Sequence, residues 1–154
     1  MPDSGSRNIR DLLNWVLFQL LIGNSDAHGK NISFYVGRDG IDVAPAYDLV
    51  NLEIYGDLYG RDLAIMAVGD TFEFNGIHAH QLADMCEECK LPQKRVVTAL
   101  NGLCTSLIKA VDSFDLSRHL IDDKPAFGQG VLDAIKANCL RFLEISKELQ
   151  YVQL

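Results

Sequence analysis

Residues 23–40 of this 154-residue chain read GNSDAHGKNISFYVGRDG, a stretch that combines a polar loop with the turn of a predicted hairpin. Its first nine residues, 23–31, combine an acid, a histidine, a lysine, two asparagines and two glycines. A loop this dense in hydrogen-bonding side chains is a common place for a functional site when rigid elements flank it. The Asp-Gly pair at 39–40 then separates two β-prone runs, 32–36 and 41–44, and predicts an antiparallel hairpin.

An apolar segment precedes the loop. Its leucine, isoleucine and valine residues recur at the spacing of a helix packed on a core, so the sequence predicts a helix over residues 8–22. The Gly23-Asn24 pair that follows is a typical helix stop. The run 12–22 superficially resembles a secretory signal, but polar residues interrupt it and no A-x-A cleavage pattern follows. It is also shorter than the ~18–20 residues that span a membrane, so we interpret it as a buried amphipathic helix.

The rest of the chain is mainly helical in pattern. Residues 45–61 are expected to be irregular, and residues 63–68 to form a short extended segment. Prolines near two of the expected starts support further helices, which we place near 78–90, 93–112, 115–121 and 126–150. The predicted fold class is therefore mainly α with one small β-hairpin. We divide the chain into a flexible lead-in, residues 1–7, and a single domain, residues 8–154.

Composition narrows the class of protein. Lys and Arg number 14 and Asp and Glu 21, which gives a formal net charge of -7. Phosphate-driven nucleic-acid binding needs a basic stripe, so this balance excludes a basic DNA-binding module, and it also disfavours an anionic membrane surface. The four cysteines lie in helical, apolar contexts, and we interpret them as reduced thiols of a cytoplasmic protein.

Two spacings point to phosphoryl transfer. Asp26 and Asn31 are five residues apart, as in the D-x-x-x-x-N of protein-kinase catalytic loops, where the Asp accepts the substrate hydroxyl proton and the Asn holds Mg²⁺. A second acid, Asp48, follows the hairpin. Because Asn31 and Asp48 flank the two antiparallel strands, strand pairing is expected to bring them close together. Amide and carboxylate oxygens are hard ligands that suit Mg²⁺.

The sequence GNSDAHGKNISF at 23–34, followed by APAYDLV at 44–50, resembles the HipA family of bacterial serine/threonine kinases, the toxins of toxin–antitoxin pairs. The family motif runs roughly N-x-D-x-H-x-K-N-[FI]-S and then P-x-Y-D, and every position is matched. The resemblance covers residues 8–150. It implies the helical C-terminal lobe of a protein-kinase-like fold, with the hairpin after the catalytic loop. It also implies transfer of the γ-phosphoryl group of ATP to a protein hydroxyl with Mg²⁺.

The resemblance implies a role for each matched residue. Asp26 corresponds to the general base or hydroxyl-orienting acid, and Asn31 and Asp48 correspond to Mg²⁺ ligands that help to hold the nucleotide. His28 is expected to orient Asp26 or to contact phosphate. Lys30 is expected to bind the nucleotide and to offset charge on the transferred phosphoryl group.

The resemblance also implies partners. The substrate is a protein, and in this family it can be a translation component such as an aminoacyl-tRNA synthetase. A small DNA-binding antitoxin is the expected partner, so this chain is expected to associate with DNA only through the antitoxin, and no membrane is involved.

Tyr47, in the P-x-Y-D segment, is expected to pack beneath Asp48.

Other interpretations of these residues stay open. The glycine-rich loop and ATP-anchoring Lys of a kinase N-terminal lobe have no counterpart in this sequence, so the chain alone is expected to have negligible kinase activity. The alternative is a non-catalytic helical binding module, a degenerate kinase half that docks a partner such as an antitoxin. A metal-dependent phosphohydrolase would need more carboxylates near the site. Considered without the motif, Asp26 would be interpreted as an acidic residue that stabilises a turn, and Asp48 as the cap of a helix.

A zinc site is a weaker interpretation of Cys86-x-x-Cys89 with His78 and His80 upstream. Structural zinc sites usually combine two such pairs, and here a single pair lies within a helical pattern. We expect both cysteines to face the core.

Overall fold

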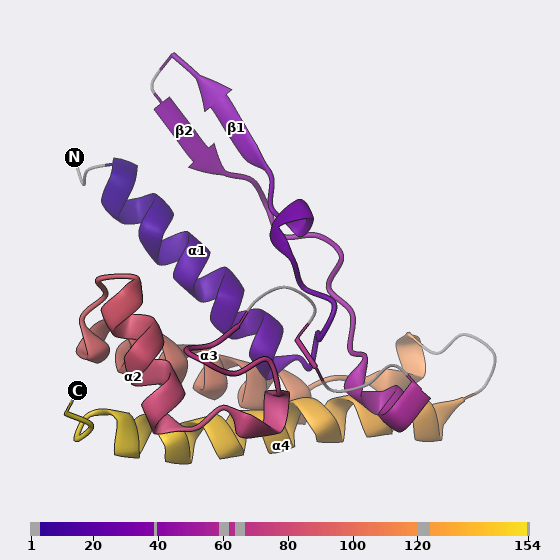
Figure 1. Cartoon of the computed structure of the whole chain (residues 1–154). Helices are drawn as coiled ribbons and strands as arrows, with labels where there is room; N and C mark the ends of the chain where they lie inside the picture. The colour runs from indigo at the N-terminus through magenta and orange to yellow at the C-terminus, as the bar shows by residue number, and fades with distance from the viewer. Residues whose placement is uncertain (1–3, 39, 59–61, 64–66, 120–123, 154) are drawn as a thin grey trace.

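The computed structural model describes residues 4–38, 40–58, 62–63, 67–119 and 124–153. In chain order the helices and strands are α1 (Ser4–Leu21), β1 (Phe34–Gly37), β2 (Gly40–Val43), α2 (Ala79–Glu88), α3 (Gln93–Asp112) and α4 (Pro125–Leu149). Helices α3 and α4 lie side by side, α1 rises from them, and the hairpin projects beyond the N-terminal half of α1 (Figure 1). The predicted fold, mainly helical with one antiparallel hairpin, is confirmed.

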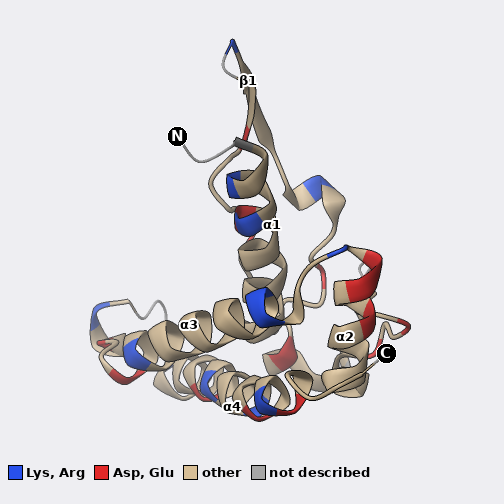
Figure 2. Ribbon diagram, turned by 90° about the vertical axis from the view of Figure 1, so that its left-hand side faces the viewer, with Lys and Arg blue, Asp and Glu red and all other residues tan. Residues whose placement is uncertain are grey.

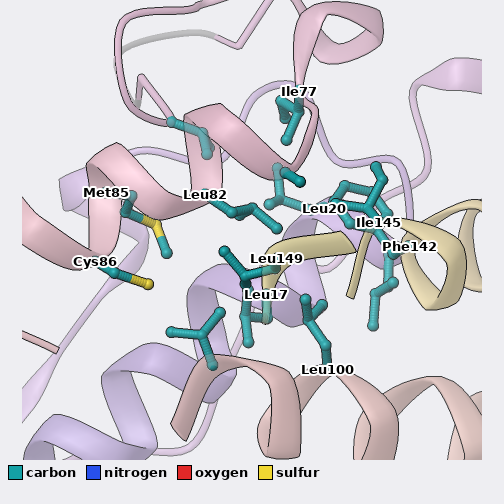
Figure 3. Packing of buried hydrophobic residues seen from close by; sticks show 14 of the residues in the cluster. Leu17, Leu20, Ile77, Leu82, Met85, Cys86, Leu100, Phe142, Ile145 and Leu149 are labelled. Carbon is teal, nitrogen blue, oxygen red and sulfur yellow. The ribbon is translucent and has the colours of Figure 1, made fainter. Parts of the chain in front are cut away.

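Helix α1 supplies the centre of the hydrophobic core. Leu17, Leu20 and Leu21 are fully buried. Figure 3 shows the residues that surround them from the other helices: Leu82, Met85, Leu100, Phe142, Ile145 and Leu149. Full burial of one leucine contributes about 1.5–3 kcal/mol, so the C-terminal half of α1 is firmly anchored. The apolar run that imitates a secretory signal is therefore a core helix.

The hairpin is exposed on both faces and is held to α1 by polar contacts. Its register pairs Phe34 with Val43 and closes with Gly37 opposite Gly40. The Arg7 guanidinium forms an ion pair with Asp42, and the Asn8 side-chain amide donates to the Ile41 carbonyl. These contacts fix the direction of the hairpin relative to the N-terminal turns of α1.

Several predicted boundaries need correction. Helix α1 begins at Ser4, inside the segment 1–7 predicted as a lead-in, because its first turns gain the hairpin contacts. The helix expected over 115–121 is wrong. Within its described part, residues 115–119, a short 3-10 turn, η4 (Leu116–Arg118), forms instead, because the Asp115 carboxylate accepts from the Ser117 amide and closes a local turn. The predicted helix over 93–112 is confirmed, and half of the predicted extended segment 63–68, residues 64–66, lies outside the described residues.

The cysteines also differ from expectation. Cys86 is buried in α2, but Cys89 lies just beyond its last residue and is exposed, so the prediction that both face the core was wrong for Cys89. Burial, together with the neighbouring Cys89, raises the pKa of the Cys86 thiol to about 11. Cys104 and Cys139 contact each other between α3 and α4, and their hydrogen bond raises the pKa of the Cys104 thiol. All four are free thiols.

Charge is unevenly distributed over the fold. In Figure 2 the blue segments of α1 lie in its N-terminal half, beside one red segment, and red segments gather on α2. Within the described ranges, no helix combines the length and the apolar character that a membrane crossing requires. Nor does any group of three or more His, Cys, Asp or Glu side chains in that part of the chain have the arrangement of a metal site.

Arg141 ties α4 to the turn before α2. One terminal nitrogen of its guanidinium donates to the backbone carbonyls of Phe74 at 3.1 Å, Asn75 at 3.3 Å and Ile77 at 2.7 Å. The guanidinium carbon also lies 5.2 Å from the ring centroids of Phe74 and Phe142. Burial lowers the pKa of Arg141 from its usual value. The two N–H bonds of this nitrogen are therefore shared among three carbonyl groups, while the other terminal nitrogen is buried without a partner among the described residues.

Replacing Arg141 by leucine is expected to lower the free energy of unfolding by about 2–3 kcal/mol, since carbonyl groups that accept from a charged donor lose it. Urea denaturation followed by circular dichroism measures the change. Arg118→Leu is the matched control, because that side chain is 79% exposed and its ion pair with Asp115 is worth less than about 1 kcal/mol. Equal effects of the two substitutions would contradict the role given to Arg141.

Candidate functional site

The candidate site begins where α1 ends. Gly23 has a φ of +71°, the left-handed conformation that favours glycine, and so terminates the helix as predicted. A Cβ at this position would lie 3.0 Å from a carboxylate oxygen of Glu53. The Gly23 carbonyl also accepts from the Leu52 amide at 3.0 Å. The turn thus places the loop 24–31 beside the segment that follows the hairpin.

Asn31 and Asp48 meet in the structure. Their side chains are 17 residues apart in sequence, and the Asn31 amide nitrogen donates to the Asp48 carboxylate. Asn31 ends the 3-10 turn η1 (Gly29–Asn31) and is 6% exposed, while Asp48 is exposed. The Asn31 side-chain oxygen accepts from the His28 backbone amide at 3.2 Å. The predicted approach of these two residues through strand pairing is therefore confirmed, and their roles stay predictions.

Asp48 has an unusual backbone. Its φ is +55°, in the left-handed region that non-glycine residues seldom adopt. Such a conformation persists where the surrounding structure holds it, and it is frequent at functional sites. The exposed carboxylate is thus held at a defined angle beside the buried Asn31 amide.

The other predicted site residues lie on the same loop. The Asp26 and Lys30 side chains are exposed. His28 is half-buried, and its Nδ1 atom is buried without a hydrogen-bond partner among the described residues. Among the described residues the His28 ring forms no hydrogen bond with Asp26, so the expected orientation of Asp26 by His28 stays a prediction. Asp26, His28 and Lys30 thus share one loop with Asn31, the residue of the four whose side chain contacts Asp48.

The donor set suits Mg²⁺ better than zinc. The Asn31 and Asp48 side chains contain an amide oxygen and a carboxylate, both hard oxygen donors, and in this structure the Asn31 nitrogen faces Asp48 while the Asn31 oxygen accepts from the His28 amide, so the amide would turn to bind a shared ion. Mg²⁺ commonly takes one or two protein ligands and completes its shell with water and substrate phosphates, so a two-residue protein contribution fits. The Asn31 oxygen faces the His28 amide, and Asp48 is open to solvent. Asn31 and Asp48 are therefore the described residues that could hold such an ion.

Tyr47 does not simply pack beneath Asp48. Its hydroxyl donates to the Lys30 carbonyl at 2.7 Å and lies 3.1 Å from the Ser33 hydroxyl. The ring stays 43% exposed. Tyr47 therefore connects the segment after the hairpin to the loop before it. The sequence did not predict this contact, because it depends on the strand register.

Two buried amides beside the loop were also missed as parts of the site. Asn24 is 3% exposed and Gln19 is fully buried, and the Asn24 amide donates to the Gln19 side-chain oxygen at 2.8 Å. The sequence offered one signal for the role of Asn24, since an asparagine in a loop often forms an Asx turn, in which its side chain accepts from the backbone amide two residues on. Gln19 gave no signal beyond interrupting an apolar run.

Comparison with known proteins identifies the family. The family model of the HipA-like C-terminal domain matches residues 2–111. The chain belongs to this family. It is 35% identical over 145 residues to the serine/threonine-protein kinase toxin HipA of Shewanella oneidensis, a match that covers 94% of this chain and 33% of that protein. It is also 43% identical over 51 residues to the putative kinase Y4mE of Sinorhizobium fredii, covering 33% of this chain and 12% of the relative.

A solved structure shares the fold. The complex of Shewanella oneidensis HipA, HipB and operator DNA contains a chain that matches with a TM-score of 0.79 and 32% identity, covering 95% of this chain and 34% of that one. The HipA-like chain described here thus spans about a third of the length of the HipA proteins that it matches.

Tyr47→Phe is expected to destabilise this HipA-like domain by about 1 kcal/mol, because the Lys30 carbonyl loses its hydroxyl donor. Amide hydrogen exchange should increase in residues 29–34 and leave α3 and α4 unchanged. Tyr35→Phe is the matched control, since the Tyr35 ring is 64% exposed on the hairpin. Unchanged exchange at 29–34 would show that the Tyr47 hydroxyl does not hold the loop.

Proposed function

We propose that this chain is the catalytic-loop and metal-binding part of a HipA-like serine/threonine protein kinase. The observation that carries the proposal is the contact between Asn31 and Asp48 beside a loop that also carries Asp26. Protein kinases use these three residue types, an Asp that orients the acceptor hydroxyl and an Asn and an Asp that hold the metal, to place a metal-bound phosphate against a hydroxyl group. The kinase names of the relatives support the same reaction class.

Each residue has a defined part in this proposal. Asp26, exposed at the loop, orients the substrate hydroxyl and accepts its proton. Asn31 and Asp48 hold Mg²⁺, which when bound neutralises charge on the ATP phosphates. Lys30, also exposed, offsets charge on the transferred phosphoryl group as a point charge. His28, whose Nδ1 is unpartnered among the described residues, contacts Asp26 or phosphate when the site is filled.

In this proposal the helices form the C-terminal lobe of a protein-kinase-like fold, and a nucleotide-binding lobe must be added for catalysis. Phosphoryl transfer depends on positioning both nucleotide and acceptor, and this sequence has no glycine-rich loop ahead of Asp26. The chain alone therefore has negligible kinase activity. The acceptor is a protein, and an antitoxin is the partner through which DNA is reached, as the complex of the Shewanella relative with HipB and operator DNA suggests.

Asp48→Asn is expected to weaken Mn²⁺ binding to the chain by about tenfold or more, because one carboxylate ligand loses its charge. Mn²⁺ stands in for Mg²⁺ here because water-proton relaxation reports its binding directly. Glu88→Gln, an exposed acid on α2, removes the same charge elsewhere and should leave the affinity unchanged. Equal affinities in wild type and Asp48→Asn would contradict the metal assignment.

Activity requires a completed kinase. We expect no phosphate transfer by the isolated chain, and transfer by a chimera in which residues 8–150 replace the matching part of the Shewanella relative. Asp26→Asn in the chimera should reduce the rate about 10²–10⁴-fold, the range for loss of general acid–base assistance. Radiolabel transfer from ATP measures this, with Glu88→Gln as the control. A chimera that keeps its rate with Asn at position 26 would overturn the role of Asp26.

A further inference from the structure

We propose that Asn24 is a positioning residue that sets the backbone of Asp26 and of Asp48 relative to each other from one buried amide group. This inference rests on the proposed function, because it assigns those two acids to the site. Asn24 lies between α1 and the loop, and 3% of its surface is exposed, so its amide has little access to water.

Every polar atom of the Asn24 side chain has a structural partner. Its Nδ2 donates to the Gln19 side-chain oxygen at 2.8 Å and to the Asp48 backbone carbonyl at 3.1 Å. Its Oδ1 accepts from the Asp26 backbone amide at 3.2 Å. Because the two acceptors face Nδ2 and the one donor faces Oδ1, the network fixes the orientation of the amide. If the amide were rotated by 180°, its Oδ1 would face two acceptor oxygens and its Nδ2 would face an N–H group.

Both acids are held by main-chain atoms. The contact to Asp26 is through its amide and the contact to Asp48 is through its carbonyl, so neither contact uses a carboxylate. Asn24 therefore occupies neither carboxylate, and the Asp48 carboxylate accepts from Asn31 instead. The carbonyl contact also acts on the residue whose φ is +55°, which gives Asn24 a direct means of holding the left-handed backbone of Asp48.

Gln19 explains why the amide stays in place. It is fully buried in α1, and the Asn24 backbone amide donates to its carbonyl at 2.9 Å while its side-chain oxygen accepts from Asn24 Nδ2. The rigid C-terminal half of α1 is thereby connected to the two acids through one side chain. Serine at position 24 can accept from the Asp26 amide, but it is too short to reach the Asp48 carbonyl as well.

Two variants separate the two halves of this role. Asn24→Ser keeps an acceptor for the Asp26 amide and removes the bridge to Asp48, whereas Asn24→Ala removes both. Ser146→Ala is the control for stability, because it removes a buried hydroxyl that bonds to Asn101 and Leu143, outside the loop. All are compared with wild type in the full 154-residue chain by NMR without metal and then by Mn²⁺ titration.

In wild type we expect both Nδ2 protons of Asn24 to exchange slowly and the three-bond HN–Hα coupling and carbon shifts of Asp48 to report a positive φ. Asn24→Ser should lose the positive-φ signature of Asp48 and retain slow exchange of the Asp26 amide, while Asn24→Ala loses both. Mn²⁺ affinity should fall about tenfold in each, the scale for loss of a group that orients a metal ligand. Ser146→Ala should change none of these.

The proposal is overturned if Asp48 keeps a positive φ in folded Asn24→Ser and Asn24→Ala, or if Ser146→Ala produces the same losses. If neither variant folds, rapid exchange of either Nδ2 proton in wild type overturns it and slow exchange of both supports it. A wild-type chain that binds no Mn²⁺ would count against the proposed function, and the metal-free NMR signatures would still decide the role of Asn24.

Discussion

The left-handed turn at Gly23 is the constraint on which the candidate site depends. It ends α1, and its missing side chain leaves room for Glu53, whose carboxylate accepts from Asn138 on α4 at 2.8 Å. The Gly23 carbonyl accepts from the Leu52 amide on the segment after the hairpin. One residue therefore joins a buried helix, a polar loop and the returning chain. Because these elements converge there, the loop has a fixed starting direction.

The hydrophobic core and the site meet along the C-terminal half of α1. Leu17, Leu20 and Leu21 are fully buried against the other helices, and Gln19, on the same turns, turns its side chain to Asn24. Burying a polar group is costly unless it is hydrogen-bonded, and the Gln19 side-chain oxygen meets this requirement through Asn24, whereas its Nε2 is buried without a partner among the described residues. Packing energy from the core thus fixes the polar atoms of the site.

Local patterns predicted the elements of the fold and the approach of two site residues. The helix over 93–112 follows from periodicity and its preceding proline, and the hairpin follows from Asp-Gly between β-prone runs. Because Asn31 and Asp48 flank the two antiparallel strands, the hairpin also predicted that they meet.

Contacts between distant segments could not be predicted in this way. The three carbonyls that Arg141 reaches lie 64 to 67 residues away, and nothing in the local sequence names them. The hydroxyl contact of Tyr47 depends on strand register, and the bridge from Asn24 to Asp48 depends on a left-handed backbone at a non-glycine residue. The prediction of a helix over 115–121 was wrong for a local reason, since the Asp115 carboxylate closes a shorter turn there.

The exposure of the hairpin has a consequence for local unfolding. A two-stranded ribbon with both faces in water is marginal by itself, so its order depends on its anchors. Of its two outer anchors, the ion pair of Arg7 with Asp42 is about half exposed and therefore weakens as ionic strength rises, whereas the Asn8 contact with the Ile41 carbonyl is uncharged. Its inner anchor is the uncharged hydroxyl contact of Tyr47, which salt does not screen. Raising the salt concentration thus loosens the outer end of the hairpin first, while its root, next to Asp48, stays attached to the loop.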